Sequence, residues 1–262
     1  MKLSSGPKVF LIAQTTTLSG VDEWLSHIDG QAARKHISGS PPETLIELAA
    51  RRCYNSFKPG VNPNVTRILT DSKAFHHNIL ESGHGSVLEH AWSTWAFEGV
   101  SRVFTHEMVR NRAGLAYSQE SLRYVRLGEL TFWLPPEIEE NPKAEQLFRQ
   151  VIHSLEEAQH VLAELFGVDK LSFNTKKQLT SAFRRIAPIG LSTGIVVSFN
   201  MRALRHVIEQ RTSPAAEIEM RIVFNEVAEI ADLAWPMLFQ DFCPEDADDG
   251  GPQVWVPNYH KV

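Results

Sequence analysis

The chain has 262 residues, of which 43% are hydrophobic and 22% charged, and its formal net charge is −5. This length and composition are typical of a globular protein with one large domain or two small ones. The acidic balance argues against a dedicated binder of nucleic-acid polymers, although it leaves room for a local basic pocket that holds a small phosphorylated ligand.

The cysteines, Cys53 and Cys243, form no CxxC motif. Their number and spacing argue against a zinc ribbon, a redox dithiol and a disulfide scaffold, and favour a reducing compartment. The apolar run VFLIA near the N-terminus is far below the ~18 residues of a membrane span and lacks the form of a signal peptide. We therefore expect a cytoplasmic protein that does not enter a membrane.

The first half of the chain predicts strands and helices in turn. β-branched and apolar residues predict a strand over 7–17, and a mixed helical pattern follows over 20–36. Pro42 suits the first turn of a helix that ends near residue 54, where Pro, Gly and Asn predict a loop over 55–64. An amphipathic helix is predicted over 65–82, and a strand over 91–98. Ser101 is expected to cap the next helix, which Gly114 interrupts.

The second half predicts longer helices. Residues 130–138 predict a strand that ends at two prolines, and helices follow over 141–167 and 172–186. A short strand is predicted over 194–200, then a helix over 200–211. Ser213 as cap and Pro214 at the first position predict a helix of ~20 residues, and the acidic tail over 243–262 is predicted to be irregular. The fold class is therefore α+β: a single domain over 1–262, with a core at about 45–240 and a mixed or antiparallel sheet flanked by long helices.

Arginines dominate the candidate chemistry, because a guanidinium matches phosphate and carboxylate groups with two parallel hydrogen bonds. In an acidic protein such concentrations favour a small anionic ligand, although each arginine taken alone is also consistent with a solvated surface pair. The arginines concerned are Arg110, Arg112, Arg123, Arg126, Arg184, Arg185, Arg202, Arg205 and Arg211.

Three other features have weaker signals. The segment from Ser118 to Ser121 offers donors and acceptors that suit a pyrimidine edge, and it is equally consistent with simple turn chemistry. The histidines between residues 76 and 90 fit no standard metal-ligand spacing, so we predict no metal site. No local His or Asn motif accompanies Cys53, which we interpret as a buried thiol.

The order of these motifs resembles the flavin-dependent thymidylate synthase family. The resemblance covers about residues 45–240 and rests on H-x-S-x-x-E-H from residue 84, R-x-R from 110, S-Q-x-S-x-R-Y from 118, F-x-x-P-P from 132, R-R-I-x-P from 184 and N-x-R-A-x-x-H-x-x-x-x-R from 200. It implies a homotetramer with active sites at subunit interfaces and FAD held without a GxGxxG motif. It also implies reductive methylation at C5 of dUMP, with methylenetetrahydrofolate as one-carbon donor and NADPH as reductant.

The resemblance also implies roles for individual residues. Arg211 matches the arginine that contacts the uracil edge and stabilises charge at N3, and with Ser121 it forms the predicted catalytic set. The implied substrate-binding residues are Glu107, Arg110, Gln119, Glu120, Ser121, Arg123, Arg184 and Arg211, with Arg123 as phosphate partner. The implied cofactor-binding residues are Cys53, His84, Ser86, Glu89, Arg110, Asn111, Arg112, Asn200, Arg202 and His206, with His84 near the folate as well.

The chain departs from the family pattern in the same region. Asn111 replaces the histidine of an Arg-His-Arg triplet, Glu107 replaces a glutamine, and eight residues rather than seven separate Arg112 from Ser121. An asparagine carries no charge, so any help from an imidazolium is lost. The longer segment keeps open UMP as acceptor, as in UMP/dUMP methylases of nucleotide-antibiotic pathways. A catalytically silent nucleotide-binding paralogue is a further alternative, whereas an RNA-binding module conflicts with the net charge and lacks interleaved aromatic and basic residues.

Overall fold

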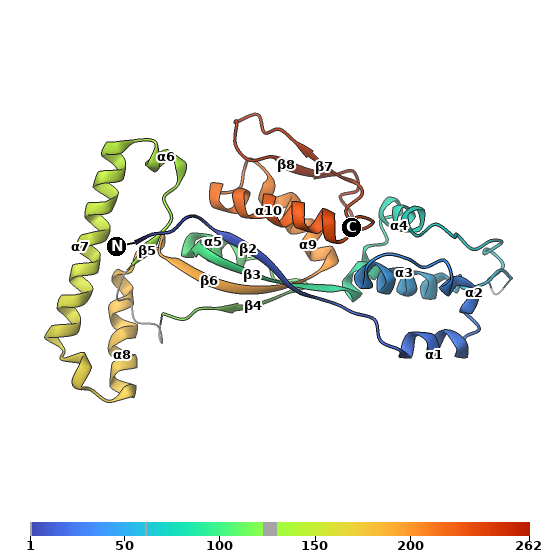
Figure 1. Ribbon diagram of the computed structural model, residues 1–262, viewed down its shortest axis with the longest axis horizontal. Helices are drawn as coiled ribbons and strands as arrows, with labels where there is room; N and C mark the ends of the chain where they lie inside the picture. The colour runs from blue at the N-terminus through green and yellow to red at the C-terminus, as the bar shows by residue number, and fades with distance from the viewer. Residues whose placement is uncertain (1, 61, 123–129) are drawn as a thin grey trace. The chain divides into compact units, whose positions relative to one another are not determined.

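The computed structural model describes residues 2–60, 62–122 and 130–262 (Figure 1). The strands are β1 (Lys2–Leu3), β2 (Lys8–Gln14), β3 (Trp92–Ser101), β4 (Leu115–Gln119), β5 (Thr131–Phe132), β6 (Ser192–Asn200), β7 (Phe242–Glu245) and β8 (Val254–Pro257). The helices are α1 (Gly20–His27), α2 (Gln31–Arg34), α3 (Pro41–Tyr54), α4 (Ser72–Glu81), α5 (Arg102–Met108), α6 (Pro136–Glu139), α7 (Pro142–Leu165), α8 (Phe173–Phe183), α9 (Met201–Thr212) and α10 (Ile218–Ala234), with 3₁₀ turns η1 (Gly85–His90), η2 (Val168–Lys170) and η3 (Arg184–Ile186). Among these residues no helix has the length and apolar content needed to cross a bilayer.

The main sheet has four strands in the order β2-β3-β6-β4. The end of β2 lies beside the start of β3, since the amide of Thr15 donates to the carbonyl of Trp92 over 2.8 Å. The end of β3 lies beside the start of β6, since the amide of Arg102 donates to the carbonyl of Leu191 over 3.1 Å. β3 is therefore antiparallel to both neighbours, and alternate residues of β3 and β6 are buried. An antiparallel sheet accompanied by helices confirms the predicted fold class.

The chain divides into two compact units. Unit 1 comprises Met1–Phe10, Ala96–Arg110 and Tyr117–Val196, and unit 2 comprises Leu11–Trp95, Asn111–Ala116 and Val197–Val262. Each unit has buried apolar side chains of its own, and the expectation of one domain over 1–262 stays a prediction.

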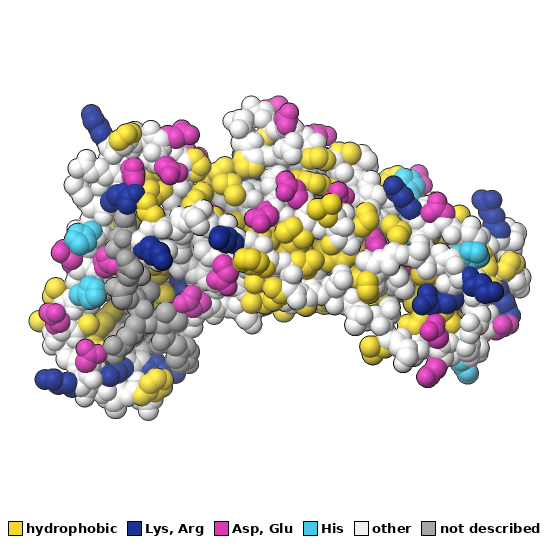
Figure 2. Space-filling model, viewed as in Figure 1, with side chains coloured by type: hydrophobic (Ala, Val, Ile, Leu, Met, Phe, Trp, Pro, Cys, Tyr) yellow, Lys and Arg dark blue, Asp and Glu magenta, His cyan; other side chains and the backbone are white. Residues whose placement is uncertain are grey.

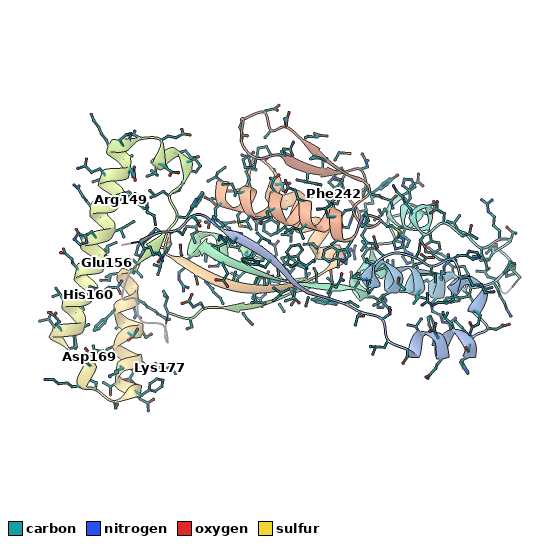
Figure 3. The ribbon with its side chains drawn as sticks, viewed as in Figure 1. Arg149, Glu156, His160, Asp169, Lys177 and Phe242 are labelled. Carbon is teal, nitrogen blue, oxygen red and sulfur yellow. The ribbon has the colours of Figure 1, made fainter. Side chains whose placement is uncertain are left out.

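The core of unit 1 forms where β5 meets α7. Phe132 and Ile152 are buried there with Leu130 and Leu191, and the Phe148 ring meets Phe132 edge-on at 6.4 Å. Glu156 accepts a hydrogen bond from the amide of Leu130 over 3.0 Å, and Figure 3 shows it on α7 between Arg149 and His160.

The apolar side chains of α7 are only partly buried. Leu147 is 62% and Leu165 75% exposed, whereas Ile152 is buried and faces the core. Figure 2 shows acidic, basic and histidine side chains mixed over α7, which is typical of a solvent-facing surface.

The core of unit 2 is built by η1, α3, α9, α10 and the β7–β8 pair. The Trp95 and Trp235 rings meet edge-on at 6.1 Å. Arg205 and Asp241, which are 1% and 2% exposed, form a buried ion pair through two hydrogen bonds of 2.8 and 2.9 Å. Charges so deeply buried are tolerated only when they are paired in this way.

Two predicted helix starts are wrong. The helix predicted from residue 65 begins at Ser72, because the Asp71 carboxylate caps it by accepting from the amides of Lys73 and Ala74. The helix predicted from Ser213 begins at Ile218, where the Glu217 side chain caps it. Residues 65–70 are irregular and residues 213–216 form a turn, so the polar cap rather than the apolar period sets each boundary.

Three further expectations need correction. The strand predicted over 130–138 is limited to Thr131–Phe132, because Pro136 begins α6. The tail, predicted to be irregular, contains the antiparallel pair β7–β8, in which Cys243 lies opposite Val256. Cys53 is exposed rather than buried, because it lies on the outer face of α3.

Candidate functional site

A cavity of about 440 Å³ in unit 1 collects arginines and polar side chains from three parts of the chain. Arg102 enters it from the first turn of α5. Gln119 and Ser121 enter it from the end of β4, and Arg184 enters it from η3. We call it the arginine cavity, and its further lining residues are Glu120, Leu122, Arg185, Ala187, Pro188 and Ile189.

Local structure fixes these side chains. Ser101 caps α5 as predicted, accepting from the amide of Phe104 over 3.1 Å, and so places Arg102 at the first helical position. The amide group of Gln119 donates to the Thr105 hydroxyl over 2.9 Å, which ties the end of β4 to α5. The walls of the arginine cavity are therefore held by a helix cap and a strand end.

Arg102 is the most constrained cation of the cavity. Its Nη2 donates to the carbonyl of Glu120 over 3.2 Å and to the Thr193 hydroxyl over 3.4 Å, while its Nε is buried without a hydrogen-bond partner among the described residues. Burial lowers the pKa of Arg102, Glu120 opposes this, and the neighbouring Arg184 lowers it further. Two guanidinium groups close enough to repel each other favour an anionic ligand between them.

A second cluster in unit 2 joins η1 to the start of α9. Nη1 of Arg202 donates to Oε1 of Glu89 over 2.7 Å. A Cβ at Gly85 would lie 2.8 Å from Nε of Arg202, so this glycine lets the guanidinium approach the backbone of η1. The H-x-S-x-x-E-H motif and the N-x-R motif therefore meet in the folded chain.

The segment that precedes β4 joins the same cluster. The side-chain oxygen of Asn200 caps α9 by accepting from the amide of Ala203 over 2.8 Å, and the backbone amide of Asn200 donates to the carbonyl of Gly114 over 2.9 Å. Gly114 has φ +74°, and a Cβ there would lie 2.5 Å from Nδ2 of Asn200. Gly114 thus turns the 111–116 segment onto the α9 cap instead of ending α5, which stops at Met108.

A second cavity, of about 760 Å³, lies along α9 in unit 2. It contains His206 and Arg211, which the sequence predicted, together with Glu209 and His260. Nδ1 of His260 lies 2.6 Å from Oε1 of Glu209. The C-terminal segment therefore brings the His260 imidazole next to α9, the helix that carries the predicted catalytic residue Arg211.

The predicted site residues fall into groups. The arginine cavity contains Gln119, Glu120, Ser121 and Arg184; the η1–α9 cluster contains Glu89, Asn200 and Arg202; the α9 cavity contains His206 and Arg211; and His84 lines another pocket of unit 2. Arg110 pairs with Glu107 over 3.3 Å near the end of α5, where the arginine is 67% exposed. Ser86 and Arg112 are exposed and Asn111 is half-buried. Arg123 and Arg126 lie outside the described residues.

Sequence reasoning missed Arg102, Glu209 and His260. Arg102 directly follows the predicted cap Ser101, which was the available signal, but its partner Thr193 is far away in the sequence. Glu209 and His260 belong to no motif of the resemblance, and only the fold brings them together.

The family model described as thymidylate synthase complementing protein matches residues 36–237. The flavin-dependent thymidylate synthase of Corynebacterium glutamicum is 34% identical over 243 residues, covering 90% of this chain and 89% of that protein. The enzyme of the same name from Mycobacteroides abscessus is 35% identical over 254 residues, covering 93% and 92%.

Solved structures share the fold. The UMP/dUMP methylase PolB from Streptomyces cacaoi, bound with 5-Br dUMP, has a TM-score of 0.62 at 14% identity and covers 91% of this chain and 95% of its own. ThyX from Helicobacter pylori, complexed with FAD and dUMP, has a TM-score of 0.55 at 20% identity, covering 85% and 92%. The chain belongs to the flavin-dependent thymidylate synthase family, whose members are C5 methyltransferases of a uridylate.

The η1–α9 cluster fits the flavin that the family implies. A guanidinium has five N–H donors, and Glu89 occupies Nη1 of Arg202, which is 44% exposed. The remaining donors, with the exposed Ser86 and Arg112, suit the diphosphate of a dinucleotide. The small Gly85 lets the Arg202 guanidinium lie against the backbone of η1.

Proposed function

We propose that this protein reductively methylates C5 of dUMP, with FAD as cofactor, methylenetetrahydrofolate as one-carbon donor and NADPH as reductant. The arginine cavity is the observation that carries the proposal, because it sets three guanidinium groups beside an amide and a hydroxyl in a volume of about 440 Å³. Cavities of roughly 300–1,000 Å³ are typical of small-molecule sites. The family membership supplies the reaction class.

In this proposal Arg102 and Arg184 bind the nucleotide's phosphate, and Arg123 remains the phosphate partner that the resemblance implies. A phosphate accepts bidentate hydrogen bonds from guanidinium groups, and Nε of Arg102 has no hydrogen-bond partner in the part of the chain that the structure describes. Gln119 and Ser121 offer polar groups to the rest of the nucleotide. An electropositive pocket of this kind selects the nucleotide over the uncharged nucleoside.

Arg211 is proposed to stabilise negative charge that develops on the uracil ring, and Ser121 completes the catalytic set. A fixed cation needs little reorganisation during the reaction, which is why preorganised charge lowers barriers effectively. FAD, when bound and reduced by NADPH, would supply the hydride that turns the transferred methylene into a methyl group. Arg202, Arg112, Ser86 and Asn200 would hold it, with Cys53, His84, Glu89, Arg110, Asn111 and His206 as the other proposed cofactor contacts.

The overall reaction balances without a cysteine nucleophile. The uracil C5 proton leaves, the one-carbon unit arrives at the oxidation level of methylene, and the two electrons of NADPH reduce it to methyl while the donor leaves as tetrahydrofolate. We also propose the homotetramer and the cytoplasmic location that the resemblance implies.

The test is steady-state methylation with purified, FAD-loaded protein. dUMP, methylenetetrahydrofolate and NADPH are supplied together, and each is omitted in turn. The expected result is dTMP in the complete mixture alone. Absence of dTMP at every pH from about 6 to about 9, in a protein that retains flavin, would reject the proposal and favour the silent paralogue. This range overlaps the interval from about pH 5 to 8 in which folded proteins are usually most stable.

UMP is the second candidate acceptor. Eight residues separate Arg112 from Ser121, five of which form β4 while Gly114 turns the segment onto the α9 cap. A polar site can select for a single hydroxyl. Comparing kcat/KM for dUMP and UMP decides between the two acceptors: a higher value for UMP would replace dUMP as the substrate and keep the reaction.

A further inference from the structure

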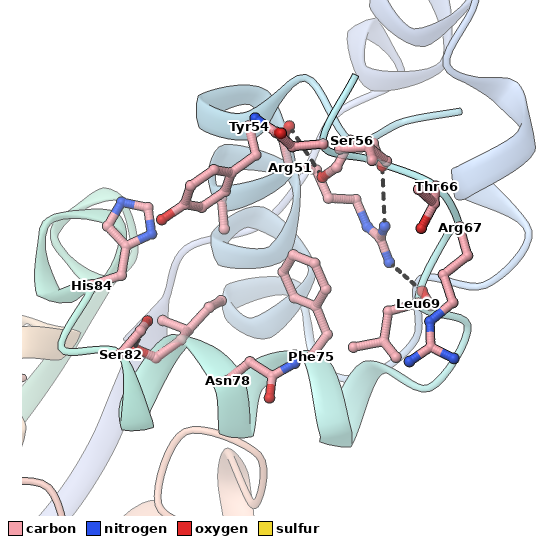
Figure 4. Close-up of a pocket in the computed structure, with 14 residues that line it drawn as sticks. Arg51, Tyr54, Ser56, Thr66, Arg67, Leu69, Phe75, Asn78, Ser82 and His84 are labelled. Atoms are coloured by element: carbon pink, nitrogen blue, oxygen red, sulfur yellow. Dashed lines mark hydrogen bonds between the residues drawn. The ribbon is translucent and has the colours of Figure 1, made fainter. Parts of the chain in front are cut away.

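A separate pocket of about 440 Å³ lies in unit 2 between α3, the segment 64–69 and α4 (Figure 4). We call it the α3–α4 pocket. The lining residues used below are Arg51, Tyr54, Arg67, Phe75, Asn78 and His84. His84 is the only one of these that the proposed catalysis uses.

The floor of the pocket is rigid and electrically balanced. Arg51, which is 1% exposed, donates from Nη2 to Oε1 of Glu47 over 2.6 Å and to the carbonyl of Leu69 over 2.7 Å. The Arg51 guanidinium also lies 4.4 Å from the centre of the Phe75 ring. This arginine therefore fastens the 64–69 segment to α3, and Glu47 cancels its charge.

The rim of the pocket is positive. Arg67 is exposed and forms no ion pair with any residue in the described ranges 2–60, 62–122 and 130–262. No carboxylate is among the described lining residues. Since the Arg51 charge is cancelled, the charge left for a ligand is that of Arg67, which favours an anionic group.

The opposite end of the pocket is aromatic. The Tyr54 and His84 rings meet edge-on at 5.5 Å, and Tyr54 is 53% exposed although its ring is large and mostly apolar. Figure 4 shows Tyr54 directed toward His84 at one end and Arg67 at the other, with Phe75 and Asn78 between them. An exposed ring at the mouth of a pocket offers stacking area to a planar group.

We infer that the α3–α4 pocket binds a planar aromatic group linked to an anion, with the ring near Tyr54 and the anion at Arg67. The inference rests on the proposed function for its candidate ligands, because both co-substrates have this chemistry. The folate donor carries an aminobenzoyl ring joined to glutamate carboxylates, and NADPH carries aromatic rings joined to phosphates.

Direct binding tests the inference without turnover. p-Aminobenzoyl-L-glutamate and NADP⁺, the oxidised form that cannot reduce the flavin, are titrated separately into FAD-loaded protein by calorimetry, so that the two arms identify the source of the ligand. Arg67→Gln removes the charge, and Tyr54→Leu removes the ring. Arg52→Gln is the matched control for the charge. Arg52 is an exposed arginine of α3, the helix that carries Tyr54, and it does not line the pocket.

For at least one probe, Arg67→Gln and Tyr54→Leu should each raise Kd about tenfold, which corresponds to the loss of one charge-assisted hydrogen bond or one stacked ring. Arg52→Gln should leave Kd unchanged, and the flavin absorbance of all three variants should match the wild type. Failure of both probes to bind, or equal Kd values in Arg67→Gln and the wild type, overturns the inference even if dUMP is methylated. Arg67-dependent binding in a protein that forms no dTMP would instead overturn the proposed function and leave the pocket assignment intact.

Discussion

Arg202 donates from Nη1 to Oε1 of Glu89 over 2.7 Å, which joins two residues that are 113 positions apart in the sequence. The two side chains are 44% and 48% exposed, so water screens the pair and its contribution to stability is small. A pair that adds little stability yet brings two motifs together is better explained by ligand binding than by folding.

Replacing Arg202 by Met should therefore release flavin without unfolding the protein. We expect the flavin-to-protein absorbance ratio after gel filtration to fall at least about fivefold, because one or more charge-assisted hydrogen bonds to the diphosphate are lost. The melting temperature of the flavin-free protein should stay within about 2 °C of the flavin-free wild type.

The matched control for this prediction is Arg149→Met. Arg149 pairs with Glu145 on α7 over 2.5 Å and is similarly exposed at 41%. It should keep wild-type flavin content. Equal flavin content in both variants would contradict the assignment of the η1–α9 cluster to the cofactor.

Arg102→Gln tests the arginine cavity. The substitution removes a cation while keeping a polar side chain, so KM for dUMP should rise about 10- to 100-fold with a smaller change in kcat, which is the effect of losing binding rather than chemistry. Deoxyuridine, which has no phosphate, should bind the wild type and the variant with similar affinity. An exposed arginine of another pair, Arg34, provides the control variant Arg34→Gln. A change confined to kcat would argue against phosphate binding by Arg102.

Asp241→Asn should be strongly destabilising. Asp241 balances Arg205 in the core of unit 2, and Nε of Arg205 has no hydrogen-bond partner among the described residues. Removing one partner of a buried pair leaves an uncompensated charge and typically costs about 3–5 kcal/mol. Urea unfolding of the flavin-free protein measures this loss. Asp22→Asn, which breaks an exposed pair with Arg34, should change the free energy of unfolding by at most about 1 kcal/mol, and similar losses in both variants would contradict the structure of the core.

Asp249 gives the protein an acid-sensitive contact. Hydrogen bonds of 2.6 and 3.0 Å from Arg221 lower the pKa of Asp249 to about 2 from 3.8. A depressed folded-state pKa stabilises the folded chain above the unfolded value, and this stabilisation is lost as pH falls from about 4 to about 2. Asp249→Asn should therefore flatten the pH dependence of the unfolding midpoint in that window and leave its shape above pH 5 unchanged. Parallel curves for variant and wild type would contradict the pairing.

Local sequence patterns predicted most elements correctly where a period and a polar cap agreed. α7, α9, β3 and β6 lie close to their predicted ranges, and Ser101 caps α5 as expected. The two helix starts were wrong because Asp71 and Glu217, which lie further along the chain than the predicted starts, cap these helices. The β7–β8 pair was missed because the four residues of each strand carry little periodic signal, and pairing with the other strand defines them.

The candidate site was predicted in part for the same reason. Motif residues such as Glu89, Arg202 and Gln119 were found because their order along the chain resembles a family. Arg102 and His260 were missed because their partners, Thr193 and Glu209, lie far away in the sequence. Only the folded chain shows that these side chains face cavities.

A single-turnover reaction tests the central claim most directly. FAD-loaded protein is reduced with NADPH without oxygen, freed of excess reductant, and mixed with methylenetetrahydrofolate and dUMP while the flavin absorbance is recorded. We predict one dTMP for each flavin that returns to the oxidised state. Flavin that stays reduced, or that reoxidises without forming dTMP, would contradict the assignment of this chain as a flavin-dependent C5 methyltransferase of dUMP.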